Sequence, residues 1–93
     1  MSLEIKTSSK FKRDLKRIMA RGYSLARMNE VVSALAEKQA LPPEYRDHAL
    51  TGKWTGYREC HIQPDWLLIY RVEKDELILL LVRSGTHSDL FGE

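Results

Sequence analysis

Ninety-three residues, of which 43% are hydrophobic and 30% charged, suit one globular domain spanning residues 1–93 and leave too little chain for a second domain. No apolar run approaches the ~20 residues of a membrane span, and no basic start precedes a long apolar stretch, so we expect a cytoplasmic protein with no membrane partner. The single cysteine, Cys60, excludes an internal disulfide and, with only three histidines, the usual cysteine-rich zinc frameworks.

Positive charge is concentrated at the start of the chain. The first 27 residues hold eight Lys and Arg against two acidic residues, a net charge of +6, so the other 66 residues carry −4 of the total of +2. Such a basic block is typical of a phosphate-binding face, but it also suits a solvated helix face or a site for an acidic protein partner. Charge alone leaves these alternatives open.

The first half of the chain predicts a strand followed by two helices. Residues 3–7 alternate apolar and polar side chains, the period of a half-buried strand. Ser8 or Ser9 then caps a helix, whose apolar stripe comprises Phe11, Leu15, Ile18 and Met19. Gly22 ends this helix. A second helix follows with the stripe Leu25, Met28, Val32, Leu35 and Ala36. Because the connection is short, we expect a hairpin whose stripes face one surface.

The second half of the chain predicts three strands. Residues 57–62 alternate, with Cys60 and Ile62 on one face and Tyr57, Glu59 and His61 on the other. Residues 66–72 and 77–82 are nearly continuous apolar runs, as in strands that are buried on both faces for part of their length. The short turns between these segments predict a three-stranded antiparallel meander. The expected fold class is therefore α+β, with an N-terminal strand, a helical hairpin and the meander.

Four polar residues beside predicted turns are candidates for chemistry: His48, His61, Asp65 and His87. If the first and third C-terminal strands flank the second, the meander brings them into one cleft. Imidazole has a reference pKa of about 6.5, so two imidazoles across a substrate form an acid–base pair at neutral pH. Each histidine could instead be an ordinary surface group, and Asp65 a turn residue. The set also has metal-ligand chemistry, but it contains no compact pair, so a metal is the weaker hypothesis.

Aromatic and basic residues near these segments have two interpretations each. Trp54, Trp66 and Phe91 suit core or edge packing, or stacking on bases beside a basic cleft. Arg83 suits an exposed strand end or a phosphate clamp, with further basic residues nearby in the sequence. The residues alone favour neither interpretation.

Two segments resemble a known family. Residues 45–70, with His61 and the turn Pro64-Asp65-Trp66, and residues 83–92, which run from Arg83 through Thr86-His87 to Phe91-Gly92, resemble the YafQ branch of the RelE/ParE toxin superfamily. The resemblance extends from Thr7 onward, and the helical half matches only by pattern. It implies a RelE-like fold and the toxin half of a bacterial type II toxin–antitoxin pair, an endoribonuclease that cuts mRNA in the ribosomal A site. The positions that match His48, His61, Asp65 and His87 are the catalytic set proposed for this branch, and those that match Trp66 and Phe91 support the substrate.

The implied reaction requires neither a metal nor a cofactor. A base removes the proton of the ribose 2′-hydroxyl, which attacks the adjacent phosphorus, and an acid protonates the departing 5′-oxygen. We assign His87 as the general acid, Asp65 with His61 as the base side, and His48 and Arg83 to the scissile phosphate; the acid and base labels can be exchanged. Four basic residues of the first helix are expected to bind ribosomal RNA: Lys10, Arg13, Lys16 and Arg17.

The resemblance also implies a cognate antitoxin of the DinJ type, which covers the cleft or adds a strand to the sheet. Promoter DNA is then a partner only through the antitoxin. Three alternatives remain: a ParE-like toxin that binds DNA gyrase, a non-catalytic module that binds RNA or a protein partner, and a metal-dependent hydrolase. The three histidines argue against the ParE-like toxin.

Overall fold

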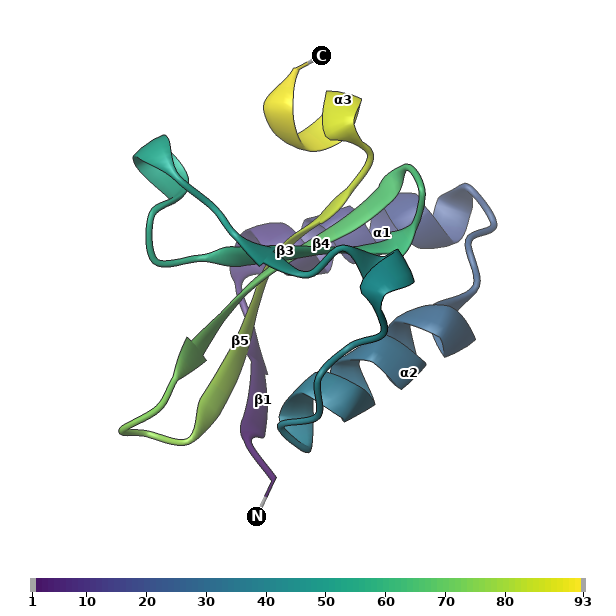
Figure 1. Cartoon of the computed structure of the whole chain (residues 1–93). Coiled ribbons are helices and arrows are strands. Elements are labelled where there is room, and N and C mark those ends of the chain that lie inside the picture. Colours follow the sequence, from purple (N-terminus) through teal and green to yellow (C-terminus); the bar gives the residue numbers. More distant parts are fainter. Residues whose placement is uncertain (1, 93) are drawn as a thin grey trace.

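The computed structural model describes residues 2–92, which form a mixed five-stranded sheet and a helical hairpin (Figure 1). In chain order the elements are β1 (Glu4–Thr7), α1 (Ser9–Ala20), α2 (Leu25–Ala36), η1 (Pro43–Tyr45), β2 (His48–Ala49), η2 (Gly52–Trp54), β3 (Arg58–Gln63), β4 (Trp66–Glu73), β5 (Ile78–Gly85) and α3 (His87–Phe91). Met1 and Glu93, the ends of the predicted domain, lie outside the described residues. The predicted α+β class is confirmed. Among residues 2–92, no helix is long and apolar enough to cross a membrane.

The strands lie in the order β1-β5-β4-β3-β2. β3, β4 and β5 pair antiparallel, so β4 lies between the other two as predicted. The N-terminal strand β1 pairs parallel with β5, with Ile5 opposite Leu79, and the sheet is therefore mixed rather than purely antiparallel. Alternation along a sequence predicts a strand but carries no information about the direction of its partner. At the other edge the short strand β2, which the sequence did not predict, places His48 opposite Glu59.

The helical hairpin supplies one side of the hydrophobic core. Ser8 caps α1, because its Oγ accepts a hydrogen bond from the backbone N–H of Phe11 at 3.0 Å. The predicted stripe of α1 is wrong at Met19, whose residue is 55% exposed, whereas Asp14 is only 2% exposed and faces inward. The α2 residues that pack in the core are Met28, Val31, Val32, Leu35 and Ala36.

β4 is the most deeply buried element of the fold. All five residues from Trp66 to Tyr70 are buried. Successive side chains of a strand point to opposite faces, and Trp66, Leu68 and Tyr70 join the core that the helices cover, while Leu67 and Ile69 are buried on the opposite face. The predicted burial on both faces is confirmed. The start of β4, which borders the candidate site, is therefore held on both sides.

Candidate active site

The end of β3, the start of β4 and the end of β5 meet at one end of the sheet, and three candidate residues lie there. His61 belongs to β3, Asp65 to the β3–β4 turn, and His87 is the first residue of α3. Asp65 Oδ1 lies 3.0 Å from His87 Nδ1 and also accepts the backbone N–H of His87 at 3.2 Å. The rings of His61 and His87 are 5.8 Å apart between centroids. Asp65 thus contacts His87 rather than His61, contrary to its predicted place on the base side.

Hydrogen bonds fix the orientation of both imidazoles. The carbonyl oxygen of Pro64 lies 3.1 Å from His61 Nδ1 and can only accept, so this nitrogen donates. The Asp65 carboxylate binds His87 Nδ1 in the same way. In each ring Nε2 is then the nitrogen left for a reacting group. Two imidazoles with their Nε2 atoms available at one site can act as an acid and a base.

His48 approaches this pair through a glutamate that the sequence analysis did not select. His48 Nδ1 lies 2.6 Å from the carbonyl oxygen of Arg46, and Nε2 lies 3.1 Å from Glu59 Oε2. Glu59 is only 5% exposed, and its Oε1 has no hydrogen-bond partner among the described residues. Alternation along β3 already placed Glu59 on the same face as His61. Burial, which alternation does not give, is what distinguishes Glu59 from an ordinary surface carboxylate.

The Asp65 carboxylate is held in its ionised form. Its pKa is lowered, first by the hydrogen bond from the His87 side chain and then by the backbone N–H of His87. An ionised carboxylate at Nδ1 orients the ring and stabilises the imidazolium that forms when Nε2 takes a proton. Asp65 therefore fits the role of a group that positions His87.

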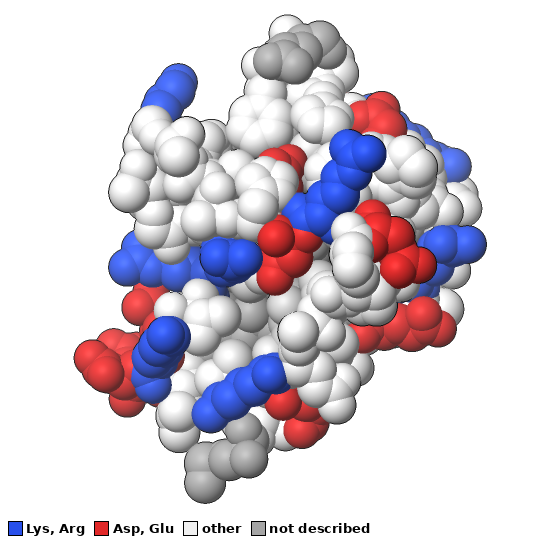
Figure 2. Space-filling view, viewed as in Figure 1, with Lys and Arg blue, Asp and Glu red and all other residues white. Residues whose placement is uncertain are grey.

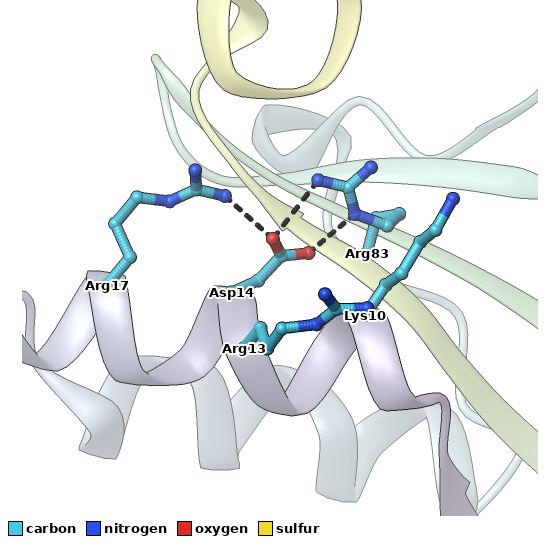
Figure 3. Close-up of a pocket in the computed structure, with 5 residues that line it drawn as sticks. All are labelled: Lys10, Arg13, Asp14, Arg17 and Arg83. Carbon is cyan, nitrogen blue, oxygen red and sulfur yellow. Dashed lines mark hydrogen bonds and ion pairs between the residues drawn. The ribbon is translucent and has the colours of Figure 1, made fainter.

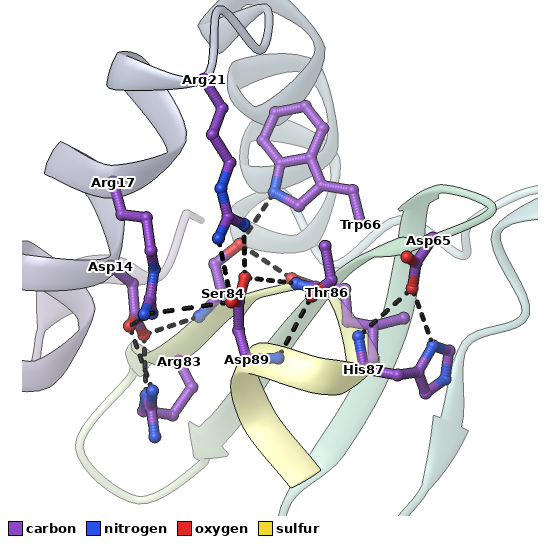
Figure 4. Close-up of polar contacts among 11 residues, drawn as sticks. Asp14, Arg17, Arg21, Asp65, Trp66, Arg83, Ser84, Thr86, His87 and Asp89 are labelled. Carbon is purple, nitrogen blue, oxygen red and sulfur yellow. Dashed lines mark hydrogen bonds and ion pairs between the residues drawn. The ribbon is translucent and has the colours of Figure 1, made fainter. Parts of the chain in front are cut away.

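The short helix α3 that carries His87 is fastened to the end of α1 (Figure 4). Thr86 Oγ1 accepts the backbone N–H of Asp89 and the Asp89 carboxylate accepts that of Thr86, which makes a capping box. Arg21 donates two hydrogen bonds to the same carboxylate, at 2.6 and 3.1 Å, and these lower the pKa of Asp89 far below its usual range. Gly85 is required beside this contact, because a Cβ there would lie 2.8 Å from Asp89 Oδ2.

A basic hollow of about 310 Å³ lies between α1 and β5, lined by Lys10, Arg13, Asp14, Arg17 and Arg83. Figure 3 shows the buried Asp14 carboxylate between Arg17 and Arg83. Asp14 accepts two hydrogen bonds from Arg83, at 2.7 and 3.1 Å, one from Arg17 at 2.7 Å, and one from the backbone of Ser84 at 3.0 Å. This contact raises the pKa of Arg83. Arg83 is therefore a held cation rather than an exposed strand-end charge.

Two predicted substrate residues fall outside the groups just described. Lys16 is exposed on α1 but, in the described structure, lies outside the basic hollow. Trp66 is 1% exposed, so its ring has no face open to a substrate, and direct contact with RNA was a wrong expectation. Its Nε1–H donates to Ser84 Oγ at 3.0 Å, and its ring packs 4.9 Å from that of Tyr23. Phe91 is half-buried, 6.3 Å from the His87 ring, and remains available.

The surface charge is more mixed than the sequence asymmetry predicted. On the face in Figure 2, Lys and Arg side chains lie among Asp and Glu rather than in one basic patch. Part of the N-terminal positive charge is also neutralised by Asp14 and Asp89. The basic hollow is therefore a local feature.

Comparison with known proteins decides the family. Residues 3–92 match the family described as "Bacterial toxin of type II toxin-antitoxin system, YafQ". This chain belongs to the YafQ toxin family. It is 36% identical, over 96% of each chain, to the mRNA interferase toxin YafQ of Escherichia coli K12. That name denotes an endoribonuclease, so the predicted enzyme class and toxin family are confirmed at the level of the family.

Two solved toxin structures are similar to this chain. A metal-bound toxin from Helicobacter pylori is 48% identical, with a TM-score of 0.91 over 96% of this chain and 99% of the other. The YafQ of the Escherichia coli DinJ–YafQ toxin–antitoxin complex is 34% identical, with a TM-score of 0.88 over 99% of this chain and 100% of the other. In the second of these structures, the Escherichia coli YafQ is in complex with the antitoxin DinJ.

Proposed function

We propose that this YafQ-family toxin cleaves mRNA in the ribosomal A site by a metal-independent acid–base reaction, with His48, His61, Asp65 and His87 as its active-site set. The observation that carries the proposal is the pair of neighbouring imidazoles, with ring centroids 5.8 Å apart, each of which is hydrogen-bonded at Nδ1 so that Nε2 is left for the substrate. Curated YafQ relatives named mRNA interferase toxins support the substrate class.

In the proposed reaction, His61 Nε2 takes the proton of the ribose 2′-hydroxyl, and the 2′-oxygen attacks the adjacent phosphorus. The bond from phosphorus to the 5′-oxygen breaks, and protonated His87 gives its proton to that oxygen. The products are a 2′,3′-cyclic phosphate and a 5′-hydroxyl, so no water, metal or cofactor is consumed. Asp65 favours His87 as the acid because a carboxylate at Nδ1 stabilises the imidazolium.

We assign phosphate binding to basic side chains around this pair. His48 is held between the Arg46 carbonyl and Glu59, and Glu59 in turn has a ligand atom within 4.8 Å of those of His61 and His87, so we place His48 on the phosphate side of the site. Arg83 keeps 20% of its side chain exposed while Asp14 fixes its direction. The basic hollow around Arg83 would bind further phosphates of the message or of ribosomal RNA, and exposed Lys16 would contact RNA from another side of α1.

The partners follow from the same proposal. The ribosome would supply a message already positioned across the two imidazoles, a contribution that can lower a barrier by about 7–11 kcal/mol. A DinJ-like antitoxin would hold the toxin inactive, as the DinJ–YafQ complex of Escherichia coli suggests. Promoter DNA would be reached only through that antitoxin.

Purified ribosomes programmed with message test the proposal. The parent chain is expected to cut the message with or without a chelator and to cut the same RNA very poorly when it is free. His87→Ala, with an unchanged thermal transition, is the control for contaminating nucleases. Efficient cleavage of free RNA would contradict the ribosome requirement, and loss of cleavage in the chelator would contradict the metal-independent reaction.

A second candidate function, metal binding at the same site, is favoured by a separate observation. Glu59, His61 and His87 can each direct one ligand atom into a cluster whose members lie within 4.8 Å of one another. Glu59 Oε1 is buried without a partner among the described residues, and each of the two histidines has the second bond at Nδ1 that metal-binding imidazoles usually make. Two similar toxin structures from Helicobacter pylori are named as metal-bound and, for a point mutant, as copper-bound.

We propose that a transition metal held here inhibits cleavage rather than driving it. The metal would occupy the Nε2 atoms that the acid–base reaction needs. Added Zn²⁺ should therefore suppress cleavage of ribosome-bound message, and a chelator should restore it. Stimulation of cleavage by Zn²⁺ would contradict this role.

A further inference from the structure

The segment that carries His48 is joined to the sheet by little backbone pairing. β2 is an edge strand of two exposed residues, which pairs with β3. The Nδ1 of His48 is directed at the carbonyl oxygen of Arg46, whose φ of +48° lies in the left-handed region that residues with side chains rarely adopt. Backbone of that kind persists only where neighbouring contacts hold it. The position of the His48 ring therefore depends on contacts outside β2.

Asp47, which directly precedes His48, supplies such contacts. Its Oδ1 accepts a hydrogen bond from the Tyr70 hydroxyl at 2.5 Å and a longer one from Arg58 Nε at 3.4 Å. Tyr70 is 2% exposed and belongs to β4, the most deeply buried strand. Burial, and then the bond to Asp47, raise the pKa of Tyr70, so its hydroxyl remains a donor at neutral pH. Asp47 thus joins the segment to both β3 and β4.

The contacts of Asp47 and His48 lie on opposite faces of the sheet. Tyr70 is opposite Arg58 in the β3–β4 register and joins the core that the helices cover. Glu59 is the next residue along β3 after Arg58, so its side chain lies on the other face. Asp47 contacts Tyr70 on the first face, and His48 Nε2 lies 3.1 Å from Glu59 Oε2 on the second. A hold on Asp47 at one face therefore fixes the His48 ring at the other.

Packing of the core does not account for the hydroxyl of Tyr70. A phenyl ring would fill the same space, and a buried hydroxyl is costly unless it is hydrogen-bonded. The partner of this hydroxyl is a carboxylate whose side chain keeps 23% of its surface exposed. Polar contacts of this kind, when they are satisfied, select one geometry among those that packing alone would allow. The pair is a specific connection between the core and the segment before β2.

We infer that Asp47 is a positioning residue for His48, and that the Tyr70 hydroxyl is the anchor through which it acts. The inference rests on the proposed function, in which His48 lies on the phosphate side of the reaction site. Loss of Asp47 should let the His48 ring move, and a displacement of about 1 Å at a catalytic group can cost about 10²-fold in rate. Ribosome binding, which we assign to other residues, should stay the same.

Single-turnover cleavage on ribosomes separates positioning from loss of the fold. Asp47→Ala should lower the rate at saturating ribosome about 10- to 100-fold, with an unchanged half-saturating ribosome concentration. Asp47→Asn should restore most of the rate, because its amide oxygen can accept the same hydroxyl. Tyr70→Phe, which keeps the ring in the core, should fall between the parent and Asp47→Ala, because Arg58 still contacts the carboxylate. Glu73→Gln, which breaks a surface pair at the far end of β4, is the matched control.

A double-mutant cycle tests whether Asp47 acts through His48. Asp47→Ala should slow cleavage by the parent but cause no further loss in a His48→Ala background. Equal fold losses in the two backgrounds would show a general structural role and overturn the inference. A parent rate in Asp47→Ala would also overturn it, and both results would leave the endoribonuclease in place.

The NMR signals of the imidazole rings test the inference without cleavage, because the chain has three histidines. Asp47→Ala and Tyr70→Phe should shift the ring signals of His48 and leave those of His61 and His87 at their parent positions. Unshifted His48 signals, or equal shifts in all three rings, would overturn the positioning. Selective shifts of His48 in a chain whose parent cuts no message would keep the positioning and overturn the proposed function.

Discussion

The contact between Arg21 and Asp89 is expected to set the position of His87, and its removal should slow cleavage far more than it destabilises the fold. Asp89→Ala removes the acceptor of both Arg21 bonds and one half of the capping box that starts α3. Loss of such a cap costs about 1 kcal/mol of unfolding free energy. For a domain of this size that lowers the melting temperature by roughly 4–8 °C.

This loss of stability is too small to inactivate the protein by unfolding. A domain stable by about 5 kcal/mol that loses about 1 kcal/mol is still about 99.9% folded. His87, however, is the first residue of the loosened helix, and a displacement of about 1 Å at a catalytic group can cost about 10²-fold in rate. The expected result is therefore a 10- to 100-fold slower reaction in a folded protein.

The assay is single-turnover cleavage of message on saturating ribosomes, with a melting curve for each variant. Arg21→Met keeps the capping box and should reproduce much of the loss of rate, while Arg21→Lys should recover part of it. Glu73→Gln, which breaks a surface pair with Arg71 of similar length at the far end of β4, is the matched control. The reasoning would be refuted if Arg21→Met and Asp89→Ala cleaved the message as fast as the parent. It would also be refuted if their cleavage rates fell by no more than the fraction of protein that is unfolded.

Four further outcomes are expected. His61→Ala should lower the cleavage rate about 10²- to 10⁴-fold with an unchanged melting curve; a rate near that of the parent would remove His61 from the reaction. Asp14→Ala should cost about 2–3 kcal/mol in chemical denaturation, because the buried Asp14 carboxylate accepts hydrogen bonds from Arg17, Arg83 and the backbone of Ser84; a loss below about 1 kcal/mol would contradict this. Lys10→Glu with Arg13→Glu should weaken ribosome binding and flatten its salt dependence, with unchanged affinity as the contrary result. Glu59→Gln should escape most of the inhibition by Zn²⁺, and equal sensitivity would place the metal elsewhere.

Much of the fold follows from periodicity alone. The alternation of residues 57–62 and the apolar runs after them predicted β3, β4 and β5 and their antiparallel pairing. Periodicity could not predict that β1 pairs parallel with β5, because that depends on where the helical hairpin returns the chain. It wrongly placed Met19 in the core and did not identify Asp14 as buried. A pattern of apolar residues cannot predict the burial of a carboxylate, because its partners, Arg83 and Ser84, come from a strand that is distant in the sequence.

The sequence predicted which residues lie near one another in the candidate site better than it predicted the hydrogen bonds between them. The meander brings His61, Asp65 and His87 to one end of the sheet, as the sequence suggested. The pairing of Asp65 with His87 depends on the turn of α3 back toward β4. The spacing of Thr86 and Asp89 is the signal of a capping box and could have indicated that turn. The burial of Glu59 depends on β2 and its loop, for which two residues of extended chain leave no periodic pattern.

The central claim is that the 2′-hydroxyl of the message is the nucleophile and that the histidine pair moves its proton. The most direct measurement uses ribosome-bound message in which the nucleotide 5′ to the cut carries a single 2′-deoxyribose, beside an all-ribose message, both in the presence of a chelator. The all-ribose message should be cut to a 2′,3′-cyclic phosphate and a 5′-hydroxyl, and the substituted message should stay intact at that position. Cleavage at the deoxyribose, or fragments that begin with a 5′-phosphate, would contradict the account.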